Sequence, residues 1–403
     1  MYMIDPFFLD ALVFMHRAVY YVIAVIPLFL LSNKKLKFDK ESIIVFVLFV
    51  CIILFAILCS ICHNSNFSFV IESFKHCFKI LCNIGLFLLW KKLFISRTVN
   101  YSFERIFANS VILYITFSLI FLVFPLLKEI WIGIIYNDRQ PLSTIQELGY
   151  LTRFGIAGWS SFGEAFWVTF GLWALIIVHN KKEISNISFF IGMIVMFFGS
   201  FFYGRYSGVI FIGILLAYAL FLFVLKKKIW MLWYSIAVIM VSIFAIGILY
   251  YCNEGIRYAV NWICEPLLNY IEGKTFSSSS TNELIAMYQN FKPTLSEWFI
   301  GSGNWNVEDE NGMHYYGNTD VGYMRNVLFG GILFTLAVYT LDVYCIYVCF
   351  RKQRHGFRVV CCVSLFMILL ISEAKGCVSL LFLRYLIPFF LAEKWYQKYR
   401  IKT

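Results

Sequence analysis

The sequence GSGNWNVEDENGMHYYGNTDVGYMR, from Gly301 to Arg325, closes the one long hydrophilic segment of the chain, which begins at Cys252. Long apolar runs flank this segment on both sides. Apolar runs of about 20 residues suit a bilayer and carry few groups able to do chemistry. We therefore expect the functional groups to lie in residues 252–325 and in the few charges that face this segment.

The composition is that of an integral membrane protein. Of the 403 residues, 61% are hydrophobic and only 14% are charged, with a mean hydropathy of +0.76. Soluble domains carry about 25% charged residues. We predict an all-α polytopic membrane protein with a single transmembrane domain over residues 1–403. The net charge of +11 does not indicate nucleic-acid binding, because the basic residues cluster in short connections between apolar runs.

The apolar runs predict about 11 transmembrane helices, each long enough to cross a bilayer. Their ranges are 9–31, 43–61, 69–90, 106–127, 162–178, 187–202, 207–225, 229–251, 326–350, 357–371 and 378–391.

The basic residues orient these spans. Most of the 34 Lys and Arg residues lie in every second connection and in the carboxyl-terminal tail. Because cytoplasmic loops are enriched in Lys and Arg, those connections are predicted to be cytoplasmic. The amino terminus and two long loops, 128–161 and 252–325, then lie outside, in the periplasm. Residues 256–271 and 280–291 predict two amphipathic helices in the second loop, the later one opening with a capping box from Ser280 to Glu283.

The predicted placement of the long loops on the periplasmic side restricts the possible chemistry. The cytoplasmic connections hold no Asp, Glu or His constellation, and nucleotide donors are absent outside the membrane. An outward-facing enzyme would therefore use a lipid-linked pyrophosphate donor. Arginine suits this ligand because its planar fork binds phosphate oxygens and stays charged. The pyrophosphate-binding candidates are Arg153, Arg205, Arg325 and Lys375. For each arginine, snorkelling to the lipid headgroups is the alternative interpretation.

Asp320 and His314 are the catalytic candidates for removing a proton from an acceptor hydroxyl. Asp320 is preferred because it lies five residues before Arg325. It could instead cap the following helix, and His314 could be an ordinary surface residue. Further candidates for the substrate loop are Gly301, Gly303, Tyr323, Glu164 and Glu373. No metal site or cofactor is predicted.

Charges also lie inside the third predicted span. At helical spacing, one face carries Glu72, Lys75, His76 and Lys79. Unpaired charges are costly in a bilayer, so this face is predicted to point into the bundle.

Several short motifs resemble the O-antigen polymerase family, of the Wzy type. They are WFIGSG at 298–303, DVGY at 320–323, GGIL at 330–333, TRFGIAGW at 152–159, GRYSG at 204–208 and EAK at 373–375. At Glu164 the chain departs from the family's pattern, where relatives often carry Asn.

The resemblance implies a GT-C-like helical fold in the bacterial inner membrane and a metal-independent, inverting glycosyltransferase of lipopolysaccharide biosynthesis. The growing glycan would leave undecaprenyl pyrophosphate and join the non-reducing end of a new lipid-linked repeat unit. Expected partners are the lipid-linked donor and acceptor, membrane lipid, a chain-length regulator and a flippase. An O-antigen ligase and a lipid-linked oligosaccharide flippase remain alternatives.

Overall fold

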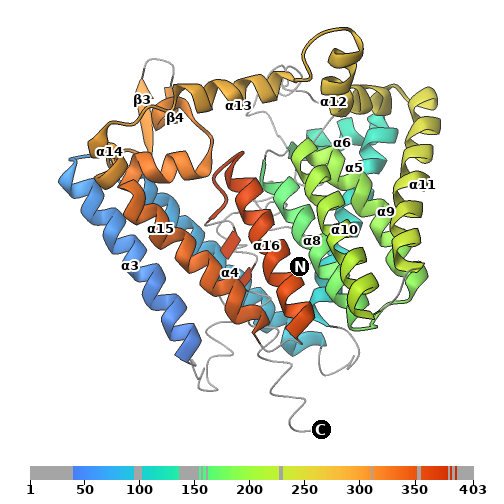
Figure 1. The fold of residues 1–403 in the computed structure, drawn as a ribbon, viewed down its shortest axis with the longest axis horizontal. Helices are drawn as coiled ribbons and strands as arrows, with labels where there is room; N and C mark the ends of the chain where they lie inside the picture. The colour runs from blue at the N-terminus through green and yellow to red at the C-terminus, as the bar shows by residue number, and fades with distance from the viewer. Residues whose placement is uncertain are drawn as a thin grey trace. The chain divides into compact units, whose positions relative to one another are not determined.

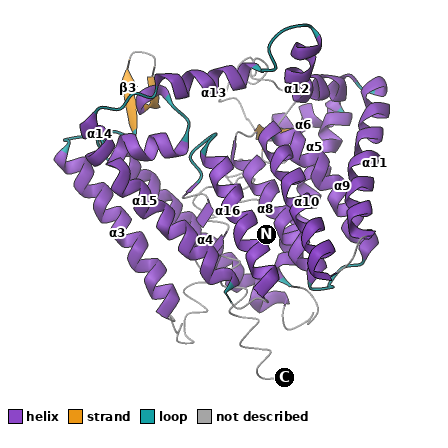
Figure 2. Cartoon of the chain, in the orientation of Figure 1, coloured by secondary structure: helices purple, strands orange, loops and turns teal. Residues whose placement is uncertain are grey.

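The computed structural model is an all-α membrane protein, and strands in its described residues form two short hairpins (Figures 1 and 2). It describes residues 40–94, 102–135, 154–155, 158–159, 162–226, 230–309, 312–351, 355–379, 382–383 and 386–387. The described elements belong to two compact units. Described residues within 86–277 form the first unit, and those within 28–85 and 278–403 form the second.

Five described helices are long and apolar enough to cross a membrane: Ile43–Cys62, Glu104–Val123, Asn186–Tyr203, Gly322–Phe350 and Gly356–Glu373. Three shorter apolar helices are Ala165–Asn180, Arg205–Phe221 and Ile236–Cys252. A helix lies at each predicted span from the second to the tenth. The first predicted span lies outside the described residues, as does most of the last.

The first unit is a bundle built mainly from hydrophobic helices. Its elements are α5 (Phe103–Val123), α6 (Pro125–Ile135), β1 (Phe154–Gly155), β2 (Gly158–Trp159), α8 (Phe162–Asn180), α9 (Asn186–Tyr203), α10 (Arg205–Lys226), α11 (Trp230–Cys252) and α12 (Glu254–Ile271). Helix α8 is buried along almost its whole described length and packs against α5 and α9. Polar caps mark helix starts: the Ser102 hydroxyl accepts from the Arg105 N–H in α5, and Asn253 caps α12 in the same way.

The antiparallel β1–β2 hairpin brings backbone into this bundle. Phe154 pairs with Trp159, and Gly155 pairs with Gly158. A Cβ at Gly155 would lie 2.6 Å from the Tyr203 hydroxyl and 2.7 Å from the Tyr114 hydroxyl. Glycine is therefore needed here because only a bare backbone fits against the two tyrosines.

The second unit contains α3 (Lys40–Cys62), the first part of α4 (Ser68–Phe94), α13 (Ser279–Asn290), α14 (Leu295–Ile300), β3 (Asn306–Asp309), β4 (Gly312–Tyr315), the 3₁₀ turn η1 (Tyr316–Asn318), α15 (Gly322–Phe350) and α16 (His355–Glu373). Helices α3 and α15 run antiparallel, since Glu41 at the start of α3 pairs with Arg351 just after α15. The hydrophilic elements α14 and η1 contact α15 near its other, amino-terminal end.

Helix α15 is two helices separated by a break at Gly331, where φ is +73° and ψ is −174°. The part after the break, residues 332–350, is about 28 Å long at 1.5 Å per residue, which matches the hydrocarbon thickness of a bilayer. Residues 322–330 form a separate short helix, which carries Arg325 and Asn326. The tertiary structure thus divides a run that the sequence presents as one span.

One local prediction was wrong. The cap of α13 is Ser278, whose hydroxyl accepts from the Thr281 N–H, so the helix begins before the predicted capping box. A true capping box forms instead between Thr294 and Glu297 at the start of α14. In the charged stripe of the third span, Glu72, His76 and Lys79 are half-buried, and Lys75 is exposed.

Candidate functional site

Two glycine motifs of the sequence interlock at the break in α15. A Cβ at Gly301 would lie 2.2 Å from the Phe329 carbonyl oxygen, and a Cβ at Gly331 would lie 2.2 Å from the Phe299 carbonyl oxygen. Both glycines have φ near +70°, in the left-handed region that other residues rarely adopt. The end of α14 and the break in α15 can therefore meet only because both carry glycine.

The break frees carbonyl groups that a continuous helix would have used. The loop after α14 supplies donors for two of them: the Ser302 N–H donates to Leu328 O at 2.7 Å, and the Gly303 N–H donates to Phe329 O at 2.8 Å. The Ser302 hydroxyl also donates to Leu328 O at 2.9 Å. Because unsatisfied backbone groups are costly at membrane depth, these bonds make the broken helix stable and hold the loop on it.

The turn between α3 and α4 holds the same loop from its other side. The Ser65 hydroxyl donates to Gly303 O at 2.7 Å, and the Asn66 amide donates to Asn306 O at 2.7 Å. A Cβ at Gly303 would lie 2.9 Å from the Ser65 hydroxyl oxygen, so glycine is required at this contact as well. Residues 301–306 are thus held between two helical elements.

Trp305, in this loop, packs in a cluster of aromatic rings. It contacts Phe69 with ring centroids 4.8 Å apart and Phe329 at 5.9 Å. Phe69 in turn stacks on Phe329 at 4.6 Å. Trp305 is only 3% exposed, and its indole N–H donates to a Glu72 carboxylate oxygen at 2.8 Å. Its ring plane is therefore defined by both packing and a charged hydrogen bond.

Arg325 stacks between two rings. The guanidinium carbon lies 3.8 Å from the centroid of Trp305 and 3.5 Å from that of Tyr315 on β4. One guanidinium N–H group donates to the side-chain oxygen of Asn306 at 3.3 Å. Stacked arginines leave their N–H edge, rather than their faces, for hydrogen bonds.

Among the described residues, the buried charge of Arg325 has no acidic partner. The residue is 6% exposed, and its Nε has no hydrogen-bond acceptor. Within the described part of the chain no carboxylate forms an ion pair with it. The two rings offer about 2 kcal/mol or more each when desolvated, which offsets part of the several kcal/mol that burial of one ion costs but leaves Nε without an acceptor. The arrangement therefore favours an anion at the guanidinium edge.

Asp320 and Tyr323 precede Arg325 in the sequence. Asp320 is exposed, and it does not cap α15, because the capping position is Val321 and no side chain caps the helix. The capping alternative for Asp320 is therefore wrong. Tyr323 packs edge-on against Tyr288 of α13, with ring centroids 6.0 Å apart. His314 is half-buried on β4, where it pairs with Val307.

The Glu373 carboxylate accepts four hydrogen bonds. One carboxylate oxygen accepts from the Val378 N–H at 2.6 Å, the Ser379 N–H at 2.8 Å and the Ser379 hydroxyl at 2.9 Å. The other accepts from the Tyr339 hydroxyl at 2.8 Å. With 2% exposure, Glu373 ties α16 to the chain that follows and to α15.

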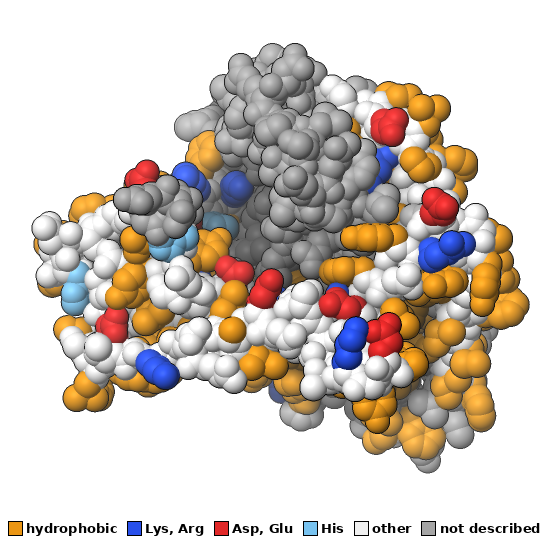
Figure 3. All heavy atoms as spheres, turned by 90° about the horizontal axis from the view of Figure 1, so that it is seen from above, with side chains coloured by type: hydrophobic (Ala, Val, Ile, Leu, Met, Phe, Trp, Pro, Cys, Tyr) orange, Lys and Arg blue, Asp and Glu red, His pale blue; other side chains and the backbone are white. Residues whose placement is uncertain are grey.

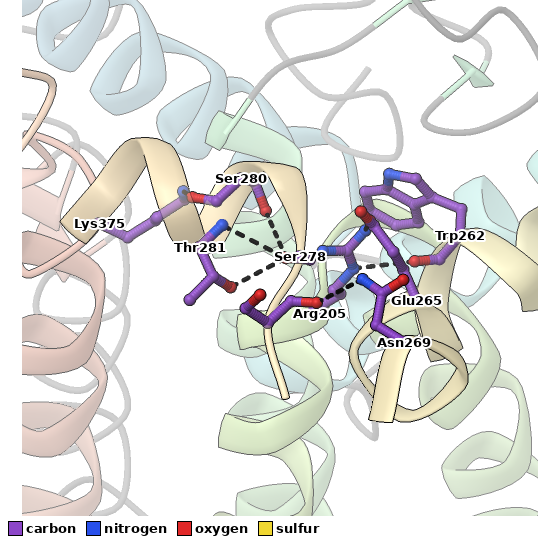
Figure 4. Close-up of polar contacts among 9 residues, drawn as sticks. Arg205, Trp262, Glu265, Asn269, Ser278, Ser280, Thr281 and Lys375 are labelled. Carbon is purple, nitrogen blue, oxygen red and sulfur yellow. Dashed lines mark hydrogen bonds and ion pairs between the residues drawn. The ribbon is translucent and has the colours of Figure 1, made fainter. Parts of the chain in front are cut away.

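Lys375 lies in the turn after α16, and its ammonium donates to the Ser280 carbonyl of α13 at 3.3 Å (Figure 4). Figure 4 also shows the cap of this helix, in which the Ser278 hydroxyl meets the Thr281 hydroxyl at 2.9 Å. The Tyr288 hydroxyl donates to the Ala374 carbonyl at 3.1 Å. Lys375 therefore helps to hold α13 to the end of α16.

Arg205 belongs to the first unit and already has an acidic partner. It forms an ion pair with Glu265 at 2.5 Å, donates to the Trp262 carbonyl at 2.9 Å and stacks over the Trp262 ring (Figure 4). Its charge is thus compensated within the chain, unlike that of Arg325. Among the other predictions for this unit, Arg153 lies outside the described residues, and Glu164 lies in the first turn of α8.

The sequence did not indicate that four further residues belong to this site: Glu72, Trp305, Asn306 and Tyr315. Trp305 and Tyr315 stood out only as aromatic residues in a hydrophilic loop, and their joint approach to Arg325 depends on the hairpin register. Figure 3 views the face that carries α13, where acidic, basic and histidine side chains lie among apolar ones. In the described ranges, no group of three or more His, Cys, Asp or Glu side chains could hold a metal ion.

Comparison of the chain with protein-family models, with curated proteins and with solved structures yields no match. The functional assignment therefore depends on the site and on the sequence motifs.

Proposed function

We propose that this protein is an O-antigen polymerase of the Wzy type. In this proposal it transfers the growing glycan from undecaprenyl pyrophosphate to the non-reducing end of a new repeat unit on the same carrier. The proposal includes about 11 spans, a GT-C-like arrangement, a bacterial inner-membrane location and a site that faces the periplasm. A chain-length regulator and a flippase are its proposed partners.

One observation carries the proposal: the buried guanidinium of Arg325 has aromatic rings on both faces and no carboxylate partner in the described chain. Such a group is suited to bind a phosphate oxygen through its edge, since charge-assisted bonds from arginine to phosphate are strong and directional. Arg325 also follows the hydrophilic segment and precedes the crossing part of α15. A lipid-linked pyrophosphate would present its charge at that level of a membrane.

In the proposed reaction the acceptor hydroxyl oxygen bonds to the anomeric carbon of the donor glycan. The bond between that carbon and the pyrophosphate oxygen breaks, and its electron pair leaves with the lipid pyrophosphate. The Asp320 carboxylate accepts the hydroxyl proton, for which its exposure and lack of a capping role make it suitable. Arg325 stabilises the negative charge that develops on the leaving pyrophosphate.

Deletion of the gene followed by gel analysis of lipopolysaccharide tests the proposal. Loss of a polymerase leaves core that carries a single repeat unit. A ligase mutant shows bare core with glycan retained on the carrier, and a flippase mutant shows neither product outside. Either of the last two patterns would refute the proposal in favour of that alternative.

Complementation then tests the site. Arg325→Ala should leave single-repeat product, because the anchor for pyrophosphate is lost, whereas Arg257→Ala should restore the full ladder. Arg257 is a suitable control because it is exposed and, among the described residues, contacts Tyr250 through the ring and the backbone carbonyl. Asp320→Asn should abolish polymer at normal protein abundance, with Glu308→Gln, an exposed residue of β3, as its control. A normal ladder from Arg325→Ala would remove the pyrophosphate assignment.

A further inference from the structure

Glu72 reaches the Arg325 site through the Trp305 ring. Its carboxylate accepts the indole N–H of Trp305 at 2.8 Å, and the face of the same ring lies 3.8 Å from the guanidinium carbon of Arg325. Glu72 lies near the start of α4, more than two hundred residues before Trp305, so only the fold brings them together. No direct ion pair between Glu72 and Arg325 is formed.

This arrangement solves an electrostatic problem of an anion site. A buried arginine needs compensation in the empty state, but a carboxylate bonded to its N–H edge would occupy the position that the anion requires. An acceptor on the indole N–H instead acts on the far edge of the ring. A hydrogen bond to a carboxylate adds electron density to the indole, which strengthens its attraction for the stacked cation. The guanidinium edge then stays available.

The hydrogen bond also determines the ring plane. Trp305 packs against Phe69 and Phe329, and such aromatic contacts permit several tilts. The bond to Glu72 selects one of them. Tyr315, on the other face of Arg325, is 41% exposed and has no comparable restraint among its described contacts. Trp305 is therefore the rigid side of the pair of rings and Tyr315 the adaptable side.

We propose that Glu72 is a positioning residue of the Arg325 anion site, holding Trp305 so that the stacked guanidinium presents its N–H edge to a phosphate-class ligand. This inference depends on the proposed function of Arg325 as the anion-binding group. It assigns a role to a charge inside the third predicted span that the reaction itself does not use.

Pyrophosphate binding to the purified full-length protein in detergent, measured by titration calorimetry, tests the inference. Glu72→Ala should weaken binding about 10-fold, the value of one charged hydrogen bond. Glu72→Gln keeps an acceptor for the indole N–H and should recover most of that affinity. If Glu72 were only a nearby negative charge, Glu72→Ala would instead tighten binding by removing repulsion. The two interpretations thus predict opposite signs.

A double-mutant comparison isolates the route through the ring. Trp305→Phe keeps an aromatic face but lacks the N–H, so in that background Glu72→Ala should have no further effect. Glu308→Gln removes the same charge at an exposed residue of β3 and serves as the electrostatic control. Melting curves of each variant, recorded without ligand, separate loss of the fold from loss of the ring position.

Three results would overturn the inference: unchanged or tighter binding in Glu72→Ala, no recovery in Glu72→Gln, or an equal loss from Glu72→Ala with and without the Trp305 N–H. Failure of the proposed function looks different. If Arg325→Ala binds pyrophosphate as tightly as the unmodified protein, the anion site itself is wrong, whatever the Glu72 variants do.

Discussion

Replacement of Gly331 by alanine tests the interlocked glycines most directly. The added Cβ would lie 2.2 Å from the carbonyl oxygen and 2.4 Å from the carbonyl carbon of Phe299. These are backbone atoms at the end of α14 and cannot rotate away as a side chain would. With φ of +73° and ψ of −174°, the position also belongs to a backbone region that only glycine adopts readily.

The expected cost has two parts. Backbone strain in such a region is about 1–3 kcal/mol. Relief of the clash requires the loop to move, which removes the bonds from the Ser302 and Gly303 N–H groups to Leu328 O and Phe329 O, at 2.7 and 2.8 Å. Each buried carbonyl left unsatisfied costs about 1–3 kcal/mol. If α15 straightens and satisfies its own carbonyls, part of this cost is recovered, so we expect a loss of about 3–6 kcal/mol.

Thermal unfolding of the purified protein in detergent measures this loss. At about 1 °C per kcal/mol for a chain of 403 residues, a loss of about 3–6 kcal/mol should lower the apparent Tm by about 4–7 °C. Pyrophosphate affinity should fall too, because the displaced loop carries Trp305. Gly213→Ala is the matched control: it adds the same methyl group to helix α10 with nothing within 4 Å, and should leave the Tm unchanged or slightly raised. An equal Tm for Gly331→Ala and the unmodified protein would refute the interlock.

Three other changes have defined outcomes. Glu373→Gln puts an NH₂ group among N–H and O–H donors and should destabilise the protein by about 2–4 kcal/mol in thermal unfolding, with no effect from exposed Glu272→Gln. Burial opposes ionisation of Glu297, but hydrogen bonds from Thr294 and Tyr316 outweigh it and lower the pKa of Glu297. Its stabilising contribution is therefore present above the ordinary value of 4.5 and lost as the pH falls below it, so Glu297→Gln should flatten the acid limb of Tm against pH. Burial lowers the pKa of Lys128 to about 8, so the unfolded state binds more protons between about pH 8 and 10.5 and stability from this group rises over that window. Lys128→Met should remove that rise.

The amino-acid sequence alone determined the class of the protein and the places of its helices. Long apolar runs leave a chain little choice but to form helices in a bilayer, so helices lie at the second to tenth predicted spans. The two amphipathic helices of the hydrophilic segment were also predicted, because an apolar stripe at helical spacing requires a surface to cover. Arg325 and the glycine motifs were recognisable as unusual in this setting.

Only the tertiary structure decided which of these residues act together. Helical periodicity cannot reveal that α15 breaks at Gly331, because the freed carbonyls are satisfied by a loop that lies far away in the sequence. Nor can it reveal that Arg205 has an acidic partner while the described chain offers none to Arg325, since ion pairs join residues from different helices. The approach of Glu72, Trp305 and Tyr315 to one guanidinium follows from packing between distant segments, and such long-range contacts leave no local pattern in the sequence.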